Sequence, residues 1–132
     1  MNNTKKIIFI FTLLTLTIST NSCKKDKEDP TISVETPEQH SIHNWGTEVH
    51  ITADFADDQG LKDYTIMVVD ADGNHSMAFD FMRTGTVSEL TYDFHDHFDV
   101  PDSAPEMAWV QFVVTDAENK TTTLDWMLHF EE

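Results

Sequence analysis

The feature that most constrains this chain is a two-residue alternation of apolar and polar side chains, which recurs in short segments after Pro30. The segment 48–55 shows it most clearly, because every second side chain from Val49 to Phe55 is apolar and those between them are polar. Such alternation is typical of a β-strand with one buried face. No stretch after Cys23 shows the 3.6-residue period of an amphipathic helix. The chain is therefore predicted to be all-β.

About seven strands are predicted, over residues 31–35, 48–55, 64–69, 77–81, 90–100, 110–114 and 124–130. Turn-forming residues separate several of them, at 57–60, 70–74, 84–85 and 116–119. Short strands with turns about every 8–12 residues favour an immunoglobulin-like antiparallel β-sandwich, with a small barrel as the main alternative. A chain of 132 residues has room for one such domain.

The N-terminus predicts an export signal. Two lysines precede an apolar run over residues 7–18, which would span about 18 Å as a helix and is too short for a bilayer core of about 30 Å. This layout is that of a signal peptide. Small residues then lead to Cys23 and resemble the lipobox of bacterial lipoproteins of the Bacteroidetes type, although Thr20 stands where leucine is usual. We predict a signal peptide over 1–22, a lipidated Cys23 with a charged tether over 23–30, and the sandwich over 31–132.

Charge and cysteine content narrow the class of protein. The net charge is −16, and from Glu28 onward only three basic side chains remain, Lys62, Arg83 and Lys120. Such a surface repels phosphate backbones and excludes nucleic acid as a partner. Cys23 is the only cysteine, so no intramolecular disulfide forms, and a lone cysteine after an apolar run supports lipidation. A multiply acylated cysteine would anchor the protein without a spanning helix.

Enzymatic motifs are lacking. The sequence contains no Gly-x-Ser-x-Gly elbow and no glycine-rich phosphate loop. The segment 70–74, which contains Asp70 and Asp72, resembles the start of a calcium loop, but Phe81 stands where an EF-hand needs glutamate. A looser calcium site is one interpretation of the loop aspartates, and simple turn formation is the favoured one; these are Asp57, Asp58, Asp70, Asp72 and Asp116. No enzyme is predicted.

The candidate metal-binding segment is residues 93–99, where Asp93, His95, His97 and Asp99 alternate with other residues. On a strand all four project from one face. Histidines two residues apart stand about 6.6 Å apart, which lets both imidazoles reach one zinc or copper ion. Adjacent second and fifth predicted strands would bring His50 to the same face. The alternative is a solvated polar face.

Surface aromatics offer a second hypothesis. Trp45 lies in a predicted loop, and Trp109 is out of phase with the apolar set of its strand. Exposed tryptophans stack on sugars or anchor a protein partner. The alternative function is therefore an interaction domain that docks on an envelope protein or glycan.

Several short motifs follow one another between residues 28 and 130: Glu48-Val49-His50-Ile51, Ala53-Asp54-Phe55 with Asp57, Leu61 with Tyr64, Gly73 with His75, His95 and His97 before Val100-Pro101, and residues 115–119. With the lipobox, they resemble the bacterial lipoprotein family called domain of unknown function 4625. The resemblance implies an immunoglobulin-like, histidine-rich protein of the cell envelope and names no activity. It also implies family histidine positions at His50, His75, His95 and His97. Val69 and Ala108-Trp109 replace histidine-containing positions of the family pattern.

Together these patterns predict a binding module of the bacterial cell envelope, an outer-membrane lipoprotein facing the periplasm or the surface. The predicted ligand is a divalent transition metal, zinc or copper. His95 and His97 would hold it, with His50 or His75 and Asp93 or Asp99 completing the shell. The predicted partners are the membrane, through the lipid anchor alone, and an envelope protein.

Overall fold

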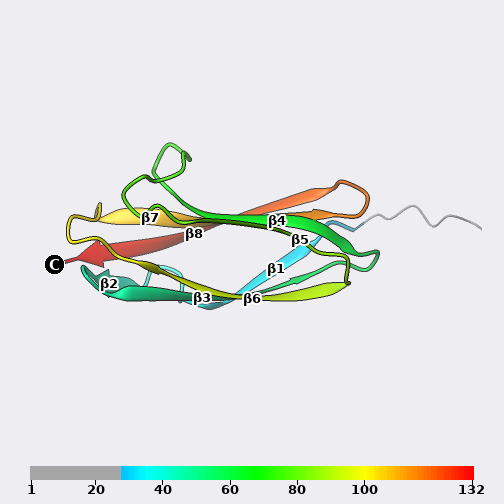
Figure 1. The fold of residues 1–132 in the computed structure, drawn as a ribbon, viewed down its shortest axis with the longest axis horizontal. Helices are drawn as coiled ribbons and strands as arrows, with labels where there is room; N and C mark the ends of the chain where they lie inside the picture. Colours follow the sequence, from blue (N-terminus) through cyan, green and yellow to red (C-terminus); the bar gives the residue numbers. More distant parts are fainter. Residues whose placement is uncertain (1–27) are drawn as a thin grey trace, which may run out of the picture.

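The computed structural model describes residues 28–132, which form eight β-strands in two packed sheets (Figure 1). The strands, in chain order, are β1 (Thr31–Thr36), β2 (Ile42–Asn44), β3 (Glu48–Ala56), β4 (Leu61–Val69), β5 (Met82–Thr86), β6 (Thr91–Asp99), β7 (Met107–Asp116) and β8 (Thr121–Glu131). No helix occurs in this part of the chain, so none in it is long and apolar enough to cross a membrane. The all-β prediction is confirmed.

One sheet has three strands in the order β1-β3-β6, and the other has five in the order β2-β8-β7-β4-β5. Neighbouring strands are antiparallel except for β2 and β8, which run parallel. The chain changes sheets between β1 and β2, near Pro37. The two sheets face each other as layers of a sandwich (Figure 1), which agrees with the predicted immunoglobulin-like fold.

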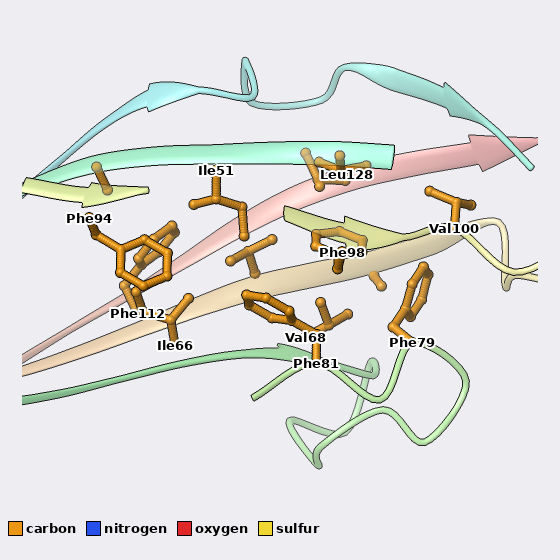
Figure 2. Packing of buried hydrophobic residues seen from close by; sticks show 14 of the residues in the cluster. Ile51, Ile66, Val68, Phe79, Phe81, Phe94, Phe98, Val100, Phe112 and Leu128 are labelled. Carbon is orange, nitrogen blue, oxygen red and sulfur yellow. The ribbon is translucent and has the colours of Figure 1, made fainter. Parts of the chain in front are cut away.

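The core lies between the inner faces of the sheets (Figure 2). The inward side chains of β3 and β6 meet those of β4, β7 and β8, and along β3 and β6 they alternate with outward side chains that are mostly polar. Phe55, Phe112 and Ile66 are almost fully buried. Burial of one such side chain stabilises a domain by about 1.5–3 kcal/mol, so this alternation fixes which face of each strand looks outward.

Two details of the predicted strands are wrong. Residues 77–80, predicted as strand, form a turn in which Asp80 adopts a φ of 47°. Residues 84–85, predicted as a turn, lie within the strand β5. Phe79 and Phe81 alternate because both rings close the sandwich against Phe98, at centroid distances of 5.6 and 5.4 Å. The short β2 was not predicted, because its three residues contain one exposed apolar side chain, Ile42.

The N-terminal segment and the C-terminus lie at opposite ends of the sandwich (Figure 1). The carbonyl oxygen of Pro30 accepts a hydrogen bond from the Thr122 hydroxyl at 2.6 Å. The turns 57–60 and 117–120 lie at this same end, joined by a hydrogen bond from Ala117 N to Gly60 O. We call this end of the sandwich, where residues 28–30 and the two turns lie, the tether end. The predicted signal peptide, Cys23 and residues 24–27 lie outside the described residues.

Candidate metal centre

The outward face of β3 and β6 gathers most of the predicted ligands. Because the two strands pair in regular antiparallel register, four side chains of one strand stand directly opposite four of the other. These pairs are Glu48 with Asp99, His50 with His97, Thr52 with His95, and Asp54 with Asp93. The prediction that the second and fifth of the predicted strands lie side by side and bring His50 to this face is therefore confirmed.

His50 and His97 form the tightest histidine pair on this face. Their ring centroids lie 5.5 Å apart. The Glu48 carboxylate lies beside both rings, with Oε2 3.6 Å from Nε2 of His50 and Oε1 3.8 Å from Nε2 of His97. All three side chains are open to solvent, with 72% of His50, 53% of Glu48 and 52% of His97 exposed. We call these three residues the histidine face.

His95 lies next along β6 and is held differently. Its Nδ1 lies 3.3 Å from the Thr52 hydroxyl, which leaves Nε2 for another partner. A shallow cavity of about 320 Å³ lies between His95 and the pair, lined by His50, Ile51, Thr52, His95, Asp96 and His97. His95 is therefore a neighbour of the histidine face, two residue pairs further along the ladder and on the same side of the sheet.

Carboxylates surround these histidines. Asp99 stands opposite Glu48, and Asp93 stands opposite Asp54. Like charges directly opposite each other on a sheet are destabilising. A cation bound near either pair would reduce that repulsion, so the charge pattern of this face favours cations. Even so, within residues 28–132, no three His, Cys, Asp or Glu side chains are already grouped so as to hold a metal ion.

Asp96 projects inward from the same strand and joins the two sheets. Its Oδ2 accepts a hydrogen bond from Arg83 Nε of β5 at 2.5 Å, and its Oδ1 accepts one from the His97 backbone N–H at 2.8 Å. Burial raises the pKa of Asp96, but the His97 N–H and the Arg83 guanidinium outweigh burial and leave that pKa below its ordinary value. The carboxylate is thus fixed as a neighbour of His97.

His75 does not join the histidine face. It lies in the loop after β4, where it forms an isolated bridge with Val69. This loop extends from the outer side of the five-stranded sheet, whereas β3 and β6 belong to the other sheet (Figure 1). Nε2 of His75 is buried and has no hydrogen-bond partner. The prediction that it could share a site with His95 and His97 therefore does not fit the fold.

The loop aspartates separate into two groups. Asp70 and Asp72 lie in the loop after β4, where Asp70 Oδ1 accepts hydrogen bonds from the N–H groups of Asp72 and Asn74 and forms a turn. Asp57, Asp58 and Asp116 lie at the tether end. A single calcium site built from all five, as the looser interpretation would require, is therefore wrong.

Neither tryptophan stands free on the surface. Trp45 is half-buried and packs against the core. Trp109 is half-buried on the outer face of the five-stranded sheet, between Val69 and Met127 on the neighbouring strands. A cavity of about 460 Å³ lies beside Trp45, lined also by Ile42, Glu106 and residues 129–132.

Sequence reasoning missed Glu48 as a potential ligand. Its signal was available, because Glu48 lies two residues before His50 and so shares its face. What the sequence lacked was the register that places His97, and not His95, opposite His50.

Eight strands in sheets of three and five define this chain as an immunoglobulin-like β-sandwich. The chain belongs to the family described as domain of unknown function (DUF4625), whose model matches residues 18–129. No curated protein matches the sequence.

Solved structures with a similar fold share little sequence with this chain. A chain from the complex of zinc 2-glycoprotein and prolactin inducible protein from human seminal plasma is 10% identical, with a TM-score of 0.51, covering 83% of this chain and 99% of its own length. OgpA from Akkermansia muciniphila, solved with an O-glycopeptide substrate, is 12% identical with a TM-score of 0.51. The fibronectin(III)-like modules of CbhA from Clostridium thermocellum are 15% identical with a TM-score of 0.48.

These likenesses cover different shares of the solved chains. The match covers 78% of this chain but 47% of the CbhA chain, and 84% of this chain but 32% of OgpA. The chain thus spans about half or less of the length of these two structures. At such low identity the likeness to OgpA and to the chain from human seminal plasma shows the fold alone.

Proposed function

We propose that this protein is a lipid-anchored binding module of the bacterial cell envelope that captures a divalent transition metal, zinc or copper, at the histidine face. The observation that carries the proposal is the pair of facing imidazoles, His50 and His97, with the Glu48 carboxylate beside both. Imidazole and carboxylate are ligands that suit zinc and copper(II). The proposed role is binding and not catalysis.

The ligand set would close around the ion. Zn–N bonds are about 2.0–2.1 Å long, and the three side chains are more than half exposed, so each can rotate without disturbing the core. His95 is the nearest further imidazole, and Asp99, opposite Glu48, is the nearest further carboxylate on the face. Water would fill any remaining position, as it does at open metal sites.

The anchor is the second part of the proposal. Cys23 follows an apolar run and small residues that resemble a lipobox. We expect labelled fatty acid supplied to the cells to appear in the full-length chain and to be absent from Cys23→Ser, which would leave the membrane fraction. Equal labelling of the two chains, or unchanged membrane retention of Cys23→Ser, would overturn the anchor and leave the metal proposal standing.

Calorimetric titration of the full-length chain in detergent with Zn²⁺ and with Cu²⁺ tests the metal site. We expect a one-to-one complex at about pH 7.5 that weakens at about pH 5.5, because protonated imidazole does not bind metal. The double variant His50→Asn/His97→Asn should lose the complex. A matched control is His40→Asn/His129→Asn, which removes another histidine pair, 5.8 Å apart. Asparagine tolerates the positive φ of His40.

One result of this titration would contradict the metal proposal. If the wild type and the His50/His97 variant give the same weak heats, the acidic surface collects cations without a site, and the metal proposal is abandoned. The second candidate, an interaction domain, would then rest on half-buried Trp109, which lies on the outer face of the five-stranded sheet with Met82 and Met107, both exposed. Aromatic and methionine side chains are enriched at protein interfaces.

A further inference from the structure

A second cation site is indicated at the tether end, far along β3 from the histidine face. A cavity of about 290 Å³ opens there between the segment that precedes β1, the turn after β3, and the start of β6. Four carboxylic residues line it: Glu28 and Asp29 from the N-terminal segment, and Asp57 and Asp58 from the turn. Since carboxylates abound on this protein, their number alone identifies nothing.

Asp57 distinguishes this cavity. Only 7% of the residue is exposed. Its Oδ1 accepts hydrogen bonds from the N–H groups of Gln59 and Gly60, both at 2.9 Å, which fixes the carboxylate in place. Its Oδ2 is buried and has no hydrogen-bond partner. A buried carboxylate oxygen without a partner is costly, so something must compensate it.

Asp116, at the neighbouring turn, is a second buried aspartate, and a cation compensates its charge. It is fully buried, and its Oδ1 also accepts two backbone N–H groups, those of Glu118 and Lys120, at 2.8 Å. Its Oδ2 likewise has no hydrogen bond, but the Lys120 ammonium stands 3.6 Å away. The two aspartates are thus built alike, and one of them has a cation beside it.

No cation of the described residues pairs with Asp57 in this way. Residues 28–132 contain three Lys and Arg side chains, and none of them lines the cavity. Lys62 Nζ donates to Asn119 at 2.6 Å, Arg83 pairs with Asp96, and Lys120 pairs with Asp116 and donates to the Glu28 carbonyl oxygen. Among residues 28–132, no side-chain cation is therefore placed to balance the Asp57 carboxylate, and a metal ion from solution would supply that charge.

We propose that Ca²⁺ binds in this cavity, with Asp57 Oδ2 as its central ligand. Asp58 and the carboxylates of Glu28 and Asp29 would supply further oxygens. Ca²⁺ accepts six to eight oxygen ligands at flexible geometry, including backbone carbonyls and water, so the carboxylates do not need to be assembled beforehand. The hard oxygen set favours Ca²⁺ over zinc or copper. The ion would fasten the segment before β1 to the domain.

The bound ion would also affect how the domain is oriented on the membrane. This part of the proposal rests on the proposed lipid anchor. A tether joined to the sandwich at residues 28–30 would fix the direction in which the domain extends from the membrane. The metal-binding part of this proposal is independent of both the anchor and the histidine face.

Thermal unfolding of the full-length chain in detergent, with chelator, Ca²⁺ or Mg²⁺, tests the site. At a calcium concentration about ten times the dissociation constant, we expect Tm to rise by roughly 5–10 °C, and extracellular modules bind Ca²⁺ with constants of about 0.1–1 mM. Asp57→Asn should abolish the rise, because the amide keeps the Oδ1 acceptor and loses the charge. Asp58→Asn, at an exposed position, should reduce it.

Two controls separate this site from its alternatives. Asp72→Asn removes an exposed turn aspartate elsewhere and should leave the calcium response intact, as should His50→Asn/His97→Asn. Ca²⁺ should also slow cleavage after Lys27 by a lysine-specific protease. An equal rise in Tm for Asp57→Asn and Asp58→Asn, or equal effects of Mg²⁺ and Ca²⁺, would show general charge screening and overturn the proposal.

Discussion

The imidazole rings of His50 and His97 face each other across β3 and β6, with their centroids 5.5 Å apart. They come from strands far apart in the sequence, so the register of the sheet creates the pair. The histidines that are closest in sequence, His95 and His97, lie on one strand at a spacing of about 6.6 Å along its axis. The register therefore makes His50 and His97 the principal ligand pair, whereas the spacing in the sequence points to His95 and His97.

His50→Asn should weaken zinc binding more than His95→Asn does. His50 shares the Glu48 carboxylate with His97, whereas His95 has one ring nitrogen beside the Thr52 hydroxyl. We expect a loss of roughly tenfold or more for His50→Asn, equivalent to about 1.4 kcal/mol, and a smaller loss for His95→Asn. Calorimetric titration of the single variants measures both. The reverse order would assign the site to the β6 pair.

The ion pair between Arg83 and Asp96 should stabilise the side of the sandwich where the edge strands β5 and β6 lie. These residues lie on β5 and β6, an edge strand of each sheet. An inward charge on an edge strand also discourages pairing with another chain. We expect Asp96→Asn to lower the free energy of unfolding by about 1 kcal/mol at neutral pH, measured by urea denaturation. A double-mutant cycle with Arg83→Met isolates the pair.

The same pair should be sensitive to acid. The pKa of Asp96 is lowered in the fold, by the His97 N–H and the Arg83 guanidinium acting against burial. Its contribution is therefore complete above the ordinary aspartate pKa and disappears as the pH falls through the lowered value. The stability difference between the wild type and Asp96→Asn should shrink accordingly. A difference that is constant from neutral to acid pH would show that the carboxylate charge contributes nothing.

The strands were predictable wherever alternation and burial agree. In β3, β6, β7 and β8 every second residue is the less exposed one and is usually apolar, so a two-residue period locates these strands. The period fails at Phe79 and Phe81, because a turn can also deliver two rings to the core. It fails at β2 because that strand is added through its backbone to β8, which leaves no pattern of side chains.

The candidate site was predictable as a face but not as a set of contacts. Alternation alone places His95, His97, Asp93 and Asp99 together, and the fold class places His50 near them. The pairing of individual residues depends on the register, which a one-residue slip would change entirely. His75 was misassigned because nothing in the sequence states that its loop lies on the other sheet.

Gly85→Ala should destabilise the domain. Gly85 of β5 lies opposite Tyr64, and a Cβ at Gly85 would stand 2.6 Å from the ring of that tyrosine. The ring cannot easily move, because Tyr92, Phe94 and Phe55 pack around it at centroid distances of 5.2, 5.7 and 5.8 Å. We expect a loss of about 1–3 kcal/mol by urea denaturation.

A neighbouring substitution provides the control for this crowding. Thr84→Ala, at an exposed position of the same strand, should change stability by no more than about 0.5 kcal/mol. If Gly85→Ala is equally mild, the ring of Tyr64 is more mobile than its packing implies.

Tyr64 should ionise only in strong base. Burial, aided by a hydrogen bond between its hydroxyl and that of Tyr92 at 3.3 Å, raises the pKa of Tyr64 to about 12. A raised pKa means that the neutral hydroxyl stabilises the fold below the ordinary tyrosine pKa of about 10, and that this contribution is lost as the pH rises towards 12. The chain contains two tyrosines, so the ultraviolet absorbance of tyrosinate should show a late step that Tyr64→Phe removes. If that step occurs near pH 10 while circular dichroism still reports the folded sheet, the packing of Phe55, Tyr92 and Phe94 around Tyr64 does not shield its hydroxyl.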